Sequence, residues 1–133
     1  MGTRDPSPML CIPAALDFFH AIGGNDIYAH NHDLAVAAAA MFAERFDGPV
    51  GASPSMTSAI SLAPLPVILP ATLGAGMEEA QALRDHLLYK QNIEVPIYAR
   101  AGRLWARLSA QVYCQMSDFE ILADAVVAWA AKR

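Results

Sequence analysis

The chain has 133 residues, of which 55% are hydrophobic and 17% charged, so it can bury one core and is too apolar for an intrinsically disordered segment. Its net charge of -4 offers no basic excess to follow a phosphate backbone, and we expect no nucleic-acid partner. We expect a single domain over residues 1–133, with an arm or loop over 1–12 and a small domain over 13–133.

The cysteines and the apolar runs indicate the cellular setting. Cys11 and Cys114 are far apart and form no CxxC pair, which predicts neither a disulfide framework nor a zinc site. The longest uninterrupted apolar run, residues 34–43, is too short to span a bilayer, and no secretion signal precedes it. We therefore expect a cytoplasmic protein with no membrane contact.

Two helices are predicted in the first third of the chain. Pro13 suits the first turn of a helix that runs to about Ile22, where Gly23 and Gly24 end it. Asn25 can cap a longer, alanine-rich helix that ends at residues 47–49, Asp-Gly-Pro.

The middle of the chain predicts a strand, a helix and a hairpin. Residues 57–65 favour a strand at the edge of a sheet, because prolines lie close by. The next helix has acidic residues in its first turn and a buried stripe at Ala80, Leu83 and Leu87. Residues 93–99 alternate as a half-buried strand, and residues 100–103 form the hairpin turn.

The strand after this turn poses the main question of the sequence. Even positions are all apolar, namely Leu104, Ala106, Leu108, Ala110 and Val112, whereas the odd positions place Arg107 among Trp105, Ser109, Gln111 and Tyr113. Such a strand packs one face on a core and offers the other to water or to a ligand. An arginine at this position is most often simply solvated.

The last helix has the clearest start signals. Ser117 and Glu120 fit an S-x-x-E capping box, and Met116 and Ile121 occupy the positions of a hydrophobic staple. The predicted order is α-α-β-α-β-β-α, an α+β fold in which helices pack on a small antiparallel sheet.

Few residues suggest chemistry on their own. The four histidines do not form a metal-binding pattern, since His30 and His32 are about 200° apart around a helix. We identify no metal ligand and no catalytic residue. Two features remain, the opening GTRDP and Arg107.

Taken together, GTRDPSPMLCIPAALDFF and LWARLSAQVYCQMSDFEILADAV resemble the class V aminotransferase family. The closer resemblance is to its isopenicillin N epimerase-like members, which are pyridoxal-phosphate enzymes of fold type I. It covers nearly all of this chain but only the C-terminal portion of such an enzyme, including its small domain. The resemblance implies a homodimer that acts on an amino acid.

The resemblance also implies roles for individual residues. The threonine of the family's Gly-Thr pair reaches the cofactor phosphate of the neighbouring subunit, which assigns cofactor binding to Gly2 and Thr3 and makes residues 1–12 a dimer-interface segment. The arginine of the R-x-S-A-x-x-Y strand binds the substrate α-carboxylate, a role that falls on Arg107. A guanidinium group suits it, because it grips a carboxylate with two parallel hydrogen bonds.

The catalytic lysine of such enzymes has no match here. Lys90 and Lys132 do not correspond to it, so we expect the chain alone to bind no pyridoxal phosphate and to be inactive. The alternative is a non-catalytic α+β module that binds a partner or itself. A domain detached from its enzyme would also expose apolar surface, for which Met9, Leu10, Ile12 and residues 62–73 are candidates.

Overall fold

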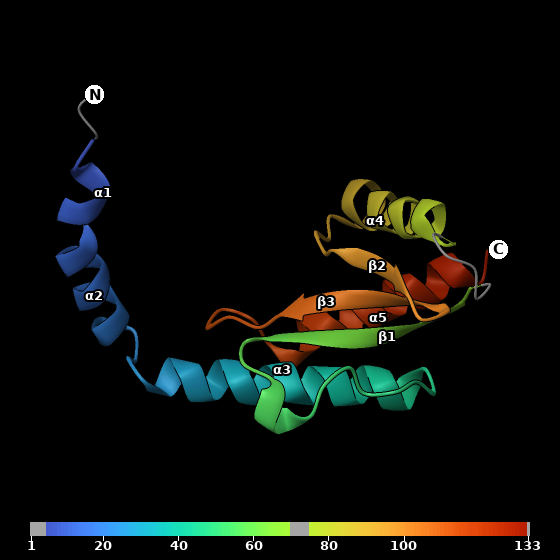
Figure 1. Ribbon diagram of the computed structural model, residues 1–133, viewed down its shortest axis with the longest axis horizontal. Coiled ribbons are helices and arrows are strands. Elements are labelled where there is room, and N and C mark those ends of the chain that lie inside the picture. The colour runs from blue at the N-terminus through green and yellow to red at the C-terminus, as the bar shows by residue number, and fades with distance from the viewer. Residues whose placement is uncertain (1–4, 70–74, 133) are drawn as a thin grey trace.

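A computed structural model of the chain describes residues 5–69 and 75–132. Figure 1 shows helices packed against a small sheet, with two helices projecting from one end. The elements in chain order are α1 (Ser7–Leu10), α2 (Ile12–Ala21), α3 (Asp26–Arg45), the short 3-10 helix η1 (Pro54–Met56), β1 (Ile60–Ile68), α4 (Met77–Gln91), β2 (Ile97–Arg100), β3 (Arg103–Ser109) and α5 (Met116–Ala130).

The predicted α+β class is confirmed. The three strands form an antiparallel sheet in the order β1-β3-β2, and α2 to α5 follow the predicted succession of helices and strands. The short helix α1 is additional and lies in the segment predicted as a loop or arm. No helix in the described part of the chain is long and apolar enough to cross a bilayer.

One core holds the sheet and three helices together. Its members come from α3, α4, α5 and one face of the sheet; the fully buried ones with large side chains include Phe42, Leu65, Leu83, Leu87, Leu104, Leu108 and Val126. Ala35 and Ala38 bring α3 close to the sheet, because their small side chains are completely buried. All three residues of the predicted α4 stripe are buried as expected.

The hairpin turn between β2 and β3 fixes the register of the sheet. Ala101 and Gly102 both have positive φ, 50° and 72°, as a two-residue type I′ turn requires. Arg100 therefore pairs with Arg103, and Tyr98 pairs with Trp105. The strand predicted over 93–99 begins only at Ile97.

Helices α1 and α2 stand apart from this core. Neither contains a buried residue, and in Figure 1 both project away from the sheet beyond the start of α3. Met9, Leu10 and Phe18 expose 65% or more of their surface. Gly23 and Gly24 end α2 as predicted, both with positive φ.

The predicted cap of the last helix is wrong by two residues. Helix α5 begins at Met116, and its capping pair is Gln115 and Asp118: the Gln115 N–H donates to Asp118 Oδ2 at 2.8 Å. The staple positions then become Cys114 and Phe119, which both pack with the core. The predicted staple residue Ile121 is instead 57% exposed.

This corrected cap can be tested by substitution. Asp118→Ala should lower the free energy of unfolding by about 1 kcal/mol, because it leaves an N-terminal N–H of α5 without its acceptor. Urea denaturation followed by circular dichroism measures the change. Glu120→Ala, the matched control, should have little effect, and the reverse ranking would restore the S-x-x-E cap.

Candidate functional site

The face of the sheet opposite the core is its outer face. We define it by Leu62 on β1, Tyr98 and Arg100 on β2, and Trp105 and Arg107 on β3. These side chains alternate along the strands with the buried ones, and each of them is half-buried or exposed. The core helices therefore leave this face open.

Arg107 lies on the outer face one residue beyond the last β2–β3 pair, Ile97 with Ala106. Its strand, β3, is the middle strand of the sheet; Arg107 is the direct partner of Leu62, and its backbone N–H donates to the Pro96 carbonyl at 3.0 Å. This hydrogen bond holds the Arg107 backbone on the β2 side of the strand, while the side chain is exposed. Within the described residues the Arg107 guanidinium forms no hydrogen bond or ion pair, so it is available to an anion.

The predicted alternation holds along the strand and fails beyond it. Leu104, Ala106, Leu108 and Ala110 are buried, as expected. Val112, predicted on the same apolar face, is 43% exposed, because β3 ends at Ser109 and the chain turns before α5. The alternating rule no longer applies once the backbone leaves the extended conformation.

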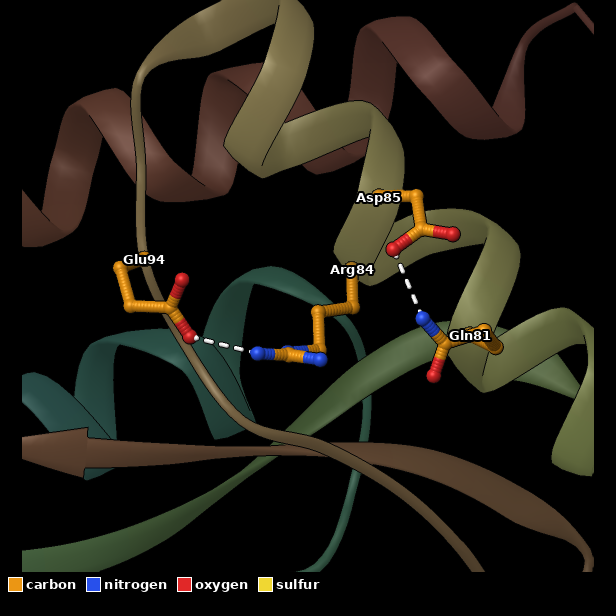
Figure 2. Close-up of polar contacts among 4 residues, drawn as sticks. All are labelled: Gln81, Arg84, Asp85 and Glu94. Atoms are coloured by element: carbon orange, nitrogen blue, oxygen red, sulfur yellow. Dashed lines mark hydrogen bonds and ion pairs between the residues drawn. The ribbon is translucent and has the colours of Figure 1, made fainter.

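Two arginines on the helices, Arg84 and Arg45, form ion pairs with acids, in contrast to Arg107. On α4, Arg84 binds Glu94 at 3.1 Å, and Gln81 donates to Asp85 at 2.7 Å (Figure 2). The hydrogen bond from Arg84 to Glu94 raises the pKa of the arginine. Arg45 similarly pairs with Asp124 at 2.5 Å.

The sheet carries only positive charge. The sequences of β1, β2 and β3 contain three charged residues, Arg100, Arg103 and Arg107, and no acid. Their positions in the alternation place all three on the outer face. This distribution is unusual in a chain with 13 acidic and 9 basic residues, and it makes the outer face locally cationic.

The Arg103 guanidinium packs against residues 47 and 48 of the same chain. Its Nη2 donates to the Asp47 carbonyl at 3.4 Å, and its Nη1 is buried without a hydrogen-bond partner among the described residues. It thereby holds residues 47–51, which we call the edge segment, against the outer face of β1. In this segment Gly48 covers the fully buried Pro64, and Gly51 packs on Leu62.

A hollow of about 570 Å³ opens on the outer face beside Arg107. Its lining consists of Gly51, Leu62, Tyr98, Ala99, Arg100, Ala101 and Trp105. The Trp105 indole N–H donates to the Arg100 carbonyl at 3.0 Å, which holds the ring in place. Arg107 is not itself a lining residue, but it neighbours the hollow through its strand partner Leu62. Sequence reasoning missed the hollow, because it depends on where the edge segment crosses the sheet.

The other predicted site residues are Gly2 and Thr3, and both lie outside the described residues. Of the opening motif only Asp5 and Pro6 are described. The hydroxyl and the N–H of Ser7 both donate to the Asp5 carboxylate, at 2.6 and 3.0 Å, and these bonds lower the pKa of Asp5. Asp5 therefore has a local role at the start of α1.

The two lysines and the two cysteines lie elsewhere. Lys90 is in the last turn of α4 and Lys132 follows α5, so neither is on the outer face. Cys11 and Cys114 are both free thiols. In the described part of the chain, no group of three His, Cys, Asp or Glu residues could hold a metal ion.

Comparison with known proteins identifies relatives that match almost the entire chain. No family model matches it. It is 34% identical over 95% of its length to a protein named probable L-cysteine desulfhydrase, chloroplastic, from Arabidopsis thaliana, and 31% identical to an L-cysteine desulfhydrase of the same plant. It is also 31% identical over 94% of its length to the isopenicillin N epimerase of Amycolatopsis lactamdurans.

The chain is homologous to a C-terminal part of class V aminotransferase-like proteins. It spans 28%, 31% and 30% of the length of these three relatives. The family resemblance predicted from the GTRDP and R-x-S-A-x-x-Y motifs is therefore confirmed. Most of each relative's length has no counterpart among these 133 residues.

The position of the edge segment can be tested at Gly48. A methyl group there would lie 2.6 Å from Pro64 Cβ and would also meet the Arg103 guanidinium. Gly48→Ala should therefore lower the free energy of unfolding by about 1–3 kcal/mol in urea denaturation, as overpacking does. Ala52→Ser enlarges an exposed residue just beyond this segment and should be nearly neutral; equal effects of the two substitutions would contradict the packing described.

Proposed function

We propose that this chain forms the small-domain part of a pyridoxal-phosphate-dependent enzyme that acts on an amino acid, and that Arg107 binds the substrate α-carboxylate. The observation that carries the proposal is an unpaired, exposed guanidinium on the central strand of an open sheet face. A guanidinium group binds a carboxylate through two parallel, charge-assisted hydrogen bonds. The relatives are named as enzymes, which favours this proposal over a non-catalytic interaction module.

Arg107 would position the substrate. Two hydrogen bonds to one carboxylate fix both the place and the plane of the amino acid, and a substrate held in a reactive orientation loses little entropy on the way to the transition state. The position of Arg107 on the middle strand of the sheet and its backbone hydrogen bond to the Pro96 carbonyl make its backbone rigid. Rigidity of this kind is what a positioning group requires.

The described residues provide a group that can bind the substrate carboxylate, but no lysine on the same face that could form the Schiff base with the cofactor. Pyridoxal phosphate supplies an electron sink for carbanion chemistry, and a lysine must hold it. Lys90 is in the last turn of α4 and Lys132 follows α5, away from the outer face, so a lysine that holds the cofactor beside Arg107 would have to come from outside these 133 residues.

The N-terminal residues complete the proposal. In this proposal Thr3 contributes a hydroxyl and Gly2 a backbone N–H to the cofactor phosphate of a neighbouring subunit. Residues 1–12 are then the dimer-interface arm of a cytoplasmic homodimer, and 13–133 are the small domain. The exposed apolar side chains of Met9, Leu10 and Ile12 support a contact surface in this arm.

The test is the turnover of amino acids by a version of the protein long enough to include the lysine. Arg107→Ala should lower kcat/KM about tenfold to a hundredfold, the cost of removing a charged hydrogen-bonding partner. Arg84→Ala, which removes an arginine from α4, should leave turnover unchanged. Turnover that survives Arg107→Ala would remove this assignment. The 133-residue chain mixed with pyridoxal phosphate should show no stable lysine-bound cofactor in its absorption spectrum.

A further inference from the structure

We propose that the hollow on the outer face binds the side chain of an elongated amino acid that ends in a second anionic group, and that Arg100 pairs with this group. The inference rests on the proposed role of Arg107, which would hold the α-carboxylate at the other end. It names a substrate class, an amino acid with two separated anions, and a residue that selects it.

The spacing of the two arginines defines the length of the ligand. Arg103 and Arg107 are four residues apart on β3, or about 13 Å at a rise of about 3.3 Å per residue. Arg100 is the direct partner of Arg103, so its Cα lies a similar distance from that of Arg107. The hollow lies between them, since Arg100 lines one part of it and Leu62, the partner of Arg107, lines another.

The lining of the hollow suits a chain of methylene groups. Trp105 and Tyr98 are strand partners and both line the hollow, and Leu62 adds an aliphatic wall. The hydrogen bond from the Trp105 indole N–H to the Arg100 carbonyl fixes the position of this ring in the lining of the hollow. An apolar wall flanked by cations binds a linker and two anions rather than a small polar side chain.

Charge explains why the second anion belongs on Arg100. Of the three arginines on the sheet, Arg103 is the least exposed, because its guanidinium packs against the edge segment, where Nη2 bonds the Asp47 carbonyl and Nη1 is buried. Arg100 and Arg107 form no ion pair with any described residue, and the strands offer no acid. Two like charges held apart in this way complement a dianion of matching length. A short amino acid bound to Arg107 would leave both Arg100 and the hollow unused.

The experiment uses the 133-residue chain and simple carboxylates as probes. We titrate labelled protein with unbranched dicarboxylates from succinate to sebacate and with octanoate, a monoanion. Binding is followed by NMR through the side-chain signals of Arg100 and Arg107 and the indole signal of Trp105. Suberate should bind roughly three- to tenfold more tightly than octanoate, which has the same number of carbons, because it gains one charged pair. Succinate should lack this advantage.

Substitutions separate this inference from the function on which it rests. Arg100→Gln should abolish the preference for suberate and leave octanoate binding intact, and Arg84→Gln, with the same change in charge, should alter neither. Equal affinity for suberate and octanoate, with both dependent on Arg107, would overturn the inference and leave the proposed function standing. Octanoate binding that survives Arg107→Gln would overturn both the inference and the proposed function. Equal effects of Arg100→Gln and Arg84→Gln on suberate binding would show only a general charge effect, and this result would overturn the inference.

Discussion

The alternation of side chains along β3 is the constraint on which the rest of the molecule depends. This strand lies in the middle of the sheet and pairs with both neighbours, so its two faces set the two faces of the sheet. Leu104, Ala106 and Leu108 are 1% exposed or less and anchor the core on which three helices pack. The register then leaves Trp105 and Arg107 on the opposite face.

The distribution of charge follows from the same geometry. An arginine is costly to bury without a partner, so those of the sheet occupy the outer face, while acids such as Glu94 and Asp124 pair with arginines on helices. A chain with a net negative charge thus acquires a cationic surface. The edge segment turns part of this flat surface into a hollow, because Gly48 and Gly51 can approach β1 closely.

The chain has an open sheet face and two projecting helices, and it matches only part of each relative. The chain matches about a third or less of each of its three relatives, and its outer face and the apolar surfaces of α1 and α2 are available for contact. In the function we propose, this part orients the substrate and the larger part holds the cofactor. The two tasks separate because carboxylate recognition needs only a rigid guanidinium, whereas the cofactor needs a lysine placed elsewhere.

The sequence by itself determined the fold class, the hairpin turn at Ala101 and Gly102 and the exposure of Arg107, because alternation and turn chemistry are local properties of consecutive residues. Tertiary structure decided the rest. The cap of α5 lies at Gln115 and Asp118, where the flanking Cys114 and Phe119 both pack with the core. Val112 is exposed because β3 ends at Ser109. The hollow that Arg100 lines forms where the edge segment packs on β1. This is a tertiary contact, and no local sequence pattern encodes it.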